Sequence, residues 1–207
     1  MSTFWRNLFS KKQPDRPTIV VVSGLPRSGT SLMQAMLQAG GIEPITDNLR
    51  VADDNNPKGY YEFERVKALK DGDNAWLAEA PGKSVKVISA LLQNLPDSYT
   101  YRILFMQREM GEVLASQKKM LIDRGEVADK VNDEQMASLF QSHLLKVQEW
   151  LKTKPNMQVL YISYNQLLKD PQPDLVRINQ FLGGNLNVAA MATVIDKSLY
   201  RQRKSTA

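Results

Sequence analysis

One segment near the amino terminus constrains the fold of this chain more than any other. Residues 24–31 are Gly-Leu-Pro-Arg-Ser-Gly-Thr-Ser, which keeps the G-x-x-x-x-G-x-[ST] spacing of a phosphate-binding loop but has Thr30 where that loop carries lysine. The β-branched run 18–23 predicts a strand buried on both faces of a parallel sheet, and the apolar spacing of 32–39 predicts a helix. A strand, a glycine turn and a helix in this order direct backbone N–H groups and the helix dipole at one point. We therefore expect an oxyanion to bind at residues 27–31.

The missing lysine restricts the chemistry that this loop can support. A kinase or nucleotide hydrolase of this type uses the lysine as a charge on the β- and γ-phosphates. Thr30 carries no charge, and the nearest cation is Arg27 at the tip of the loop. One arginine among several hydroxyls suits a smaller, less charged transferring group than the γ-phosphate of ATP. A P-loop kinase acting on a small molecule and a noncatalytic nucleotide-binding protein are the alternative hypotheses.

The loop sequence Pro-Arg-Ser-Gly-Thr-Ser resembles the 5′-phosphosulfate loop of the sulfotransferase family, whose usual form is P-[KR]-S-G-T-[ST]. The resemblance implies transfer of a sulfuryl group from 3′-phosphoadenosine-5′-phosphosulfate (PAPS) to a hydroxyl or amine, with release of PAP and without a metal ion. It implies that five loop residues bind the cofactor: Arg27, Ser28, Gly29, Thr30 and Ser31. Arg27 is also expected to act in catalysis, by stabilising charge on the leaving 5′-phosphate.

Arg108 and Ser116 predict a second anion site. Arg108 follows the predicted strand 101–106, and Ser116 lies eight residues later, about two turns along the predicted helix 109–122. Together they can hold one phosphate through hydrogen bonds. The pair resembles the 3′-phosphate site of sulfotransferases, in which a serine follows an arginine by eight positions. The resemblance also implies a basic carboxyl-terminal segment, including Arg201, that covers the cofactor; its usual glycine-rich form is missing, and a solvated basic tail is the alternative.

Apolar periodicity predicts that strands and helices alternate along the chain. The expected strands after the first are 84–88, 101–106 and 158–163, and the expected helices after the first are 109–122, 133–152, 174–182 and 186–195. This alternation predicts a three-layer α/β/α fold with a mainly parallel, P-loop-like sheet, formed by residues 17–207 as one domain. Ligands of such sheets lie beyond the carboxyl ends of the strands, where the loop and Arg108 both fall. The polar stretch 46–59 predicts a long loop on the substrate side.

Two further stretches support the family resemblance. Residues 56–62, Asn-Pro-Lys-Gly-Tyr-Tyr-Glu, are similar to the N-P-x-G-[YF]-x-E stretch of bacterial sulfotransferases. Residues 164–171 are similar to the Y-x-x-L-x-x-D-P segment of many members, and we interpret them as structural, with Tyr164 and Leu167 packing in the interior. The resemblance therefore extends from about residue 18 to the carboxyl terminus.

The acceptor needs a general base, and the sequence offers several candidates. Cytosolic family members use a histidine two residues after a strand-end lysine, but valine and isoleucine follow Lys86 here. The sole histidine, His143, falls on an apolar helix face and is predicted to be a packed interior residue. Other branches of the family use a glutamate, so Glu62 is the first candidate and Glu64 the second. Lys86 is expected to orient the acceptor or support the transferring group.

Composition narrows the protein class. The chain has 207 residues, a formal net charge of +5 and no cysteine, which excludes disulfides and thiolate metal sites. Its basic residues are spread along the sequence, which favours an anionic cofactor over nucleic acid. The amino terminus lacks the apolar core of a signal peptide and no apolar run has the length of a membrane span, so we expect a cytoplasmic protein. Residues 1–16 form a basic, aromatic extension, which is expected to dock on the domain or to fray; a helix on a membrane surface is the alternative. The expected acceptor is a small molecule, glycan or peptide.

Overall fold

The centre of the molecule is a parallel sheet, as predicted. The computed structural model describes residues 16–53, 56, 59–126 and 132–196. Its four named strands are β1 (Thr18–Gly24), β2 (Ser84–Lys86), β3 (Thr100–Gln107) and β4 (Met157–Ser163). They pair in the order β2-β1-β3-β4 and every pairing is parallel. All four strands therefore end at the same edge of the sheet.

Strand β1 lies inside the sheet, between β2 and β3. Val21 is aligned with Val85 on one side and Ile103 on the other, and all three side chains are fully buried. The β-branched run of this strand suits such a position, because branched side chains pack well on both faces of a pleated sheet. The phosphate-loop spacing thus begins at the end of a strand that neighbouring strands hold on both sides.

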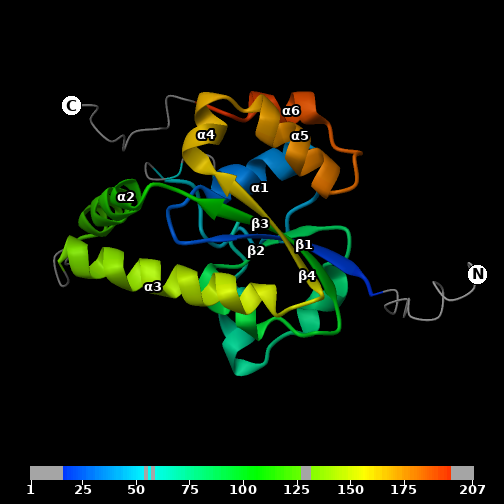
Figure 1. Ribbon diagram of the computed structural model, residues 1–207, viewed down its shortest axis with the longest axis horizontal. Coiled ribbons are helices and arrows are strands. Elements are labelled where there is room, and N and C mark those ends of the chain that lie inside the picture. The colour runs from blue at the N-terminus through cyan, green and yellow to red at the C-terminus, as the bar shows by residue number, and fades with distance from the viewer. Residues whose placement is uncertain (1–15, 54–55, 57–58, 127–131, 197–207) are drawn as a thin grey trace, which may run out of the picture.

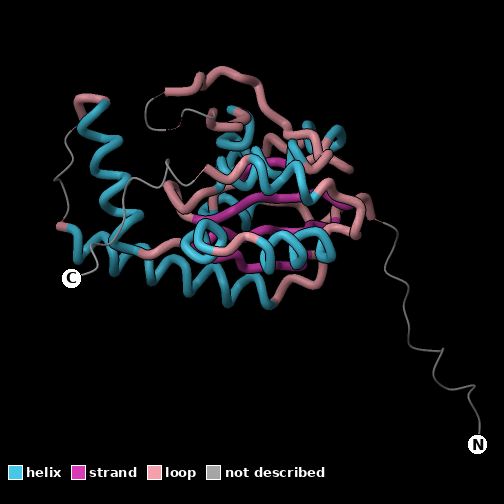
Figure 2. The backbone as a smooth tube through the Cα atoms, turned by 90° about the horizontal axis from the view of Figure 1, so that it is seen from above, coloured by secondary structure: helices cyan, strands magenta, loops and turns pink. Residues whose placement is uncertain are grey.

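Helices cover both faces of the sheet (Figures 1 and 2). One layer contains α1 (Thr30–Ala39), α4 (Tyr164–Lys169), α5 (Gln172–Phe181) and α6 (Val188–Thr193), which share one apolar core with the sheet. The other layer contains α3 (Asp133–Lys152) and three 3₁₀ helices, η2 (Glu64–Asp71), η3 (Ala75–Glu79) and η4 (Ser89–Asn94), around a second core. Helix α2 (Met110–Asp123) follows β3 and lies beyond the strand ends, beside α3. The predicted three-layer arrangement is confirmed.

Several elements differ from the prediction. Helix α4 starts directly after β4, because the Ser163 side chain caps it by accepting a hydrogen bond from the Gln166 N–H at 3.3 Å. The segment 64–94 contains the three 3₁₀ helices and the short strand β2. Such short helices leave little apolar periodicity in the sequence from which they could be predicted. The predicted last helix is shorter than expected: Asn187 caps α6 by accepting from the Ala190 N–H at 3.0 Å.

Both termini of the chain extend beyond the described residues. The predicted extension 1–16 lies outside them except for Arg16, whose Nη1 donates to the Asp97 carbonyl at 2.7 Å. Arg201, predicted to bind the cofactor, also lies outside them. Among the described residues, no helix combines the length and the apolar character needed to cross a bilayer.

Candidate functional site

The loop between β1 and α1 is held against the ends of β3 and α4. Gly29 has a φ of +99°, and a Cβ atom there would overlap the Tyr164 ring. Gly24 has a φ of +143°, and a Cβ atom there would lie 2.6 Å from the Met106 carbonyl oxygen. Both positions thus require glycine, for the backbone conformation and for the close approach. The first N–H groups of α1 have no partner within the helix, so this packing presents them as an anion site.

Arg27, at the tip of the loop, connects the two predicted anion sites. Its φ of +69° is uncommon for a residue with a side chain. From this position its Nε donates to the Ser116 hydroxyl on α2 at 2.9 Å, and its carbonyl accepts from Arg108 Nη1 at 3.1 Å. Burial lowers the pKa of Arg27, and Tyr60 partly opposes this shift. A residue of the first site therefore contacts both residues of the second.

Arg108 is oriented by a buried acid that the sequence analysis did not identify. Its Nε donates to Glu112 at 3.0 Å, and the two side chains are only 8% and 4% exposed. The Asn165 amide donates to both oxygens of Glu112 at 3.1 Å, and the Arg108 guanidinium lies 4.6 Å from the centre of the Tyr164 ring. The i,i+4 spacing of arginine and glutamate is visible in the sequence, whereas the amide from α4 is not.

Lys86 ends strand β2 beside the loop. Its Nζ donates to the Tyr60 carbonyl at 2.8 Å and to the Ser31 hydroxyl at 3.2 Å, and it lies 3.5 Å from Glu62 Oε1. Burial lowers the pKa of Lys86 to about 8, although the charge of Glu62 acts in the opposite direction. The amine therefore connects the phosphate-loop helix to the candidate base.

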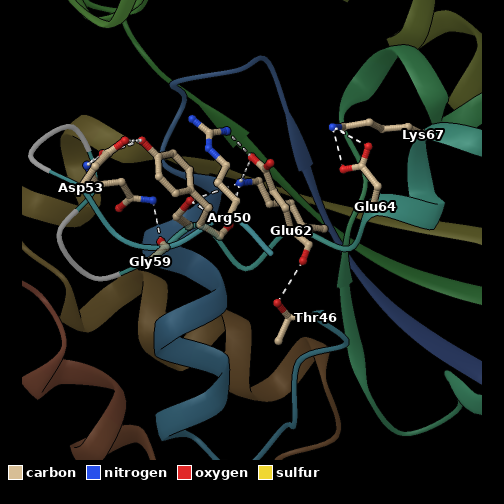
Figure 3. Close-up of polar contacts among 11 residues, drawn as sticks. Thr46, Arg50, Asp53, Gly59, Glu62, Glu64 and Lys67 are labelled. Atoms are coloured by element: carbon tan, nitrogen blue, oxygen red, sulfur yellow. Dashed lines mark hydrogen bonds and ion pairs between the residues drawn. The ribbon is translucent and has the colours of Figure 1, made fainter. Parts of the chain in front are cut away.

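Glu62, which follows the predicted long loop 46–59, contacts residues of that loop (Figure 3). Arg50 Nη1 donates to Glu62 Oε1 at 2.8 Å, and the same guanidinium lies 3.3 Å from the centre of the Tyr60 ring. The Tyr60 hydroxyl donates to Asp53 at 2.7 Å. Arg50 was not predicted, because its spacing from Glu62 carries no motif and only the folded loop brings the two side chains together.

These residues surround a cavity of about 420 Å³ above the strand ends. Eight of the predicted site residues line it: Arg27, Gly29, Thr30, Ser31, Glu62, Lys86, Arg108 and Ser116. Four lining cations were not predicted: Arg50, Lys67, Lys119 and Arg124. Of the acidic side chains, only Glu62 and Asp196 are among the described lining residues. The lining therefore carries more cationic than acidic side chains, which suits an anionic ligand.

Three predicted residues do not line the cavity: Ser28, Glu64 and His143. The Ser28 side chain is buried and its hydroxyl donates to the Leu25 carbonyl at 2.7 Å, so it supports the loop and does not line the cavity. Glu64 contacts Lys67 at 2.7 Å on the surface, apart from Glu62 (Figure 3).

The prediction that His143 is a packed interior residue is wrong. It is half-buried, its Nε2 lies 2.9 Å from the Ser89 hydroxyl, and it is not a lining residue of the cavity. Burial and Lys146 lower its pKa. His143 lies on the apolar face of α3, which is why the sequence predicted an interior position. Only the carboxyl-terminal end of this helix packs closely on the sheet, and Leu151 is its one buried residue.

Within the part of the chain that the structure describes, no group of histidine, aspartate and glutamate side chains has the arrangement of a metal site.

Comparison with known proteins places the chain among sulfotransferases. The profile of the sulfotransferase domain family matches residues 17–207. Among solved structures, the sulfotransferase domain from the Synechococcus PCC 7002 olefin synthase is similar, with 17% identity, a TM-score of 0.59, and coverage of 95% of this chain and 91% of that one. A retinol dehydratase solved with androsterone and PAP matches at 21% identity and a TM-score of 0.47, over 87% of this chain and 64% of that one. No curated protein sequence matches this chain.

Proposed function

Because this chain belongs to the sulfotransferase family, we propose that it transfers a sulfuryl group from PAPS to a hydroxyl or amine of an acceptor and releases PAP. The observation that carries this proposal is the contact between Arg27 and Ser116, which joins two anion sites across one cavity. Such a pair of sites suits a nucleotide with two separate anionic groups. Thr30, where a kinase loop has lysine, supports sulfuryl over phosphoryl transfer.

The order of the strands supports an orientation for the two substrates. The phosphate loop follows the central strand β1, Arg108 follows β3 and Lys86 ends β2. With its 3′-phosphate at Arg108 and Ser116, the nucleotide lies toward β3. The reacting hydroxyl or amine of the acceptor then lies on the side of β2, where Lys86, Glu62 and Arg50 line the cavity.

Each catalytic residue has a role that follows from its position. The acceptor oxygen or nitrogen forms a bond to sulfur while the bond between sulfur and the phosphate oxygen breaks, and the electron pair remains on the phosphate. Arg27 and the N–H groups of α1 stabilise this charge, with the Thr30 and Ser31 hydroxyls beside them. Lys86, whose amine donates a hydrogen bond to the Ser31 hydroxyl, supports the transferring group.

Glu62 is the proposed base that takes the acceptor's proton. It lines the cavity and lies 3.5 Å from Lys86, whereas Glu64 pairs with Lys67 on the surface and His143 pairs with Ser89. Both cation contacts of its carboxylate fall on Oε1. They hold the group in position at the acceptor side of the loop.

Calorimetric titration with PAP, AMP and ATP tests the proposal. PAP should bind at least about tenfold more tightly than AMP, because a charge-assisted contact contributes about 1.5–3 kcal/mol. Arg108→Ala should remove this preference while leaving AMP affinity nearly unchanged. Ser116→Ala provides a second variant, because it leaves the buried Glu112 paired with Arg108. A preference for ATP, or equal binding of PAP and AMP by the wild type, would contradict the proposal.

A further inference from the structure

The cavity extends beyond the two anion sites along helix α2. Ser116, Met120 and Arg124 are spaced four residues apart, and all three line the cavity together with Lys119. Residues at this spacing share one face of a helix. At a rise of 1.5 Å per residue, Arg124 starts about 12 Å beyond Ser116 along the helix axis. This end of the cavity is therefore a separate region from the predicted 3′-phosphate site.

Arg124 carries the least compensated charge in this outer region. The two other outer cations have acidic partners: Lys67 contacts Glu64 at 2.7 Å, and Lys119 contacts Asp123 at 2.9 Å. Arg124 itself makes no ion pair with any residue in the described ranges, and it is exposed. An arginine guanidinium presents planar donors that match a carboxylate, sulfate or phosphate.

Apolar side chains form part of the same lining. Val66 from η2, Ile88 just before η4, Leu91 within η4 and Met120 from α2 all line the cavity. They give an apolar wall to the cavity that also contains Lys86 and Arg124. Such a lining binds hydrocarbon or an aromatic ring by burial of apolar surface.

We infer that the acceptor is an amphipathic anion: a hydroxyl or amine at one end, an apolar segment in the middle and an oxyanion at the other end. Arg124 binds the oxyanion, with Lys119 beside it, and the apolar wall binds the middle segment. This inference rests on the proposed function, because the nucleophile must reach Glu62 and Lys86 while the oxyanion stays at Arg124. It assigns Arg124 to specificity for the acceptor and not to the cofactor.

A binding series on the PAP-saturated protein tests the inference. The probes are ω-hydroxyalkanoates from hydroxyhexanoate to hydroxydodecanoate, the ω-hydroxyalkyl phosphates of the same lengths, and the neutral α,ω-diols. Calorimetry measures each affinity for the wild type and for Arg124→Ala, Arg124→Lys and Lys118→Ala. Lys118 is the matched control, because its loss changes the net charge equally on the same helix but it is not a lining residue.

At least one anionic probe should bind about five- to tenfold more tightly than the diol of its length, as expected for one charge-assisted contact in a partly open site. Arg124→Ala should reduce that preference to about twofold or less. Arg124→Lys should restore part of it, and Lys118→Ala should leave it unchanged. PAP affinity should be the same in all four proteins. The anionic group of the tighter-binding probe, carboxylate or phosphate, identifies the oxyanion.

Three results would overturn the inference while leaving the proposed function intact. These are equal binding of anionic and neutral probes at every length, an equal effect of Lys118→Ala and Arg124→Ala, and a loss of PAP affinity in Arg124→Ala that matches its loss of probe affinity. The last result would assign Arg124 to the nucleotide. Failure of the wild type to bind PAP would instead contradict the proposed function itself, and the inference with it.

Discussion

The two sides of the cavity are built in different ways. On the cofactor side, the backbone determines the site: Gly24 and Gly29 adopt conformations that favour glycine, and the loop packs directly on Met106 and Tyr164. On the acceptor side, side chains determine it, through the contacts of Glu62 with Arg50 and Lys86. A backbone site keeps its shape when one side chain changes, whereas a side-chain network reorganises. The shape of the phosphate loop should therefore survive polar substitutions around it, although a substitution such as Arg108→Ala still removes a contact to the nucleotide. The arrangement of the acceptor side should not survive them.

Glu62→Gln tests this contrast with the largest expected effect. The amide cannot accept the acceptor's proton, so turnover should fall about 10²–10⁴-fold, the usual contribution of a positioned base. PAP affinity should remain, because the backbone site does not depend on Glu62. Turnover at saturating PAPS and calorimetry with PAP measure the two quantities.

Two variants serve as controls for Glu62→Gln. Glu64→Gln alters a surface carboxylate paired with Lys67, and His143→Asn alters a residue outside the cavity lining. Neither should change turnover specifically. Normal turnover in Glu62→Gln together with an inactive but fully stable His143→Asn would assign the base to the histidine.

Gly29→Ala is expected to have the next largest effect, on the cofactor side. The added Cβ meets the Tyr164 ring and the φ of +99° is unfavourable for alanine, so the variant should lose about 2–4 kcal/mol of unfolding free energy. Gly41→Ala is a matched control, since its φ is +102° and nothing lies within 4 Å of its added Cβ. It should lose only about 1 kcal/mol, from the backbone conformation. Denaturant unfolding measures both; equal losses would show that the Tyr164 contact is unimportant.

Lys86 joins the two sides, and its titration should give the smallest effect. Burial lowers its pKa to about 8, below the ordinary value of 10.5, so the unfolded chain binds more protons at this site between these two pH values. Stability therefore rises with pH in this window, because the folded protein no longer holds a buried charge. As the pH rises from about 8 to 10.5, the unfolding free energy of the wild type should increase relative to that of Lys86→Met.

A difference between the wild type and Lys86→Met that stays constant as the pH rises would contradict this prediction. It would show that burial does not lower the pKa of Lys86.

Much of the cofactor side could be predicted from the sequence. The β-branched run before Gly24 and the glycine spacing encode a strand and a turn within a few residues, and the four predicted strands form the sheet. Arg108 and Ser116 were predicted together because the pair resembles the 3′-phosphate site of sulfotransferases, in which a serine follows an arginine by eight positions. In each case the interactions that decide the structure are local in the chain.

How the remaining residues are used depends on packing between distant segments. The tertiary structure turned the Ser28 hydroxyl toward Leu25 and away from the cavity, and it left His143 half-buried. It also placed Arg50 on Glu62, and Asn165 on the acid that holds Arg108.

These contacts join positions on separate elements, or across an irregular loop, and they depend on where packing brings side chains together. Glycine and β-branched residues act on their own backbone, so the sequence was sufficient to predict the strand, the turn and an anion site at the end of β1. Which glutamate lines the cavity, and which cations surround it, depends on how residues 46–66 fold onto the strand ends, and no periodicity in that segment encodes this.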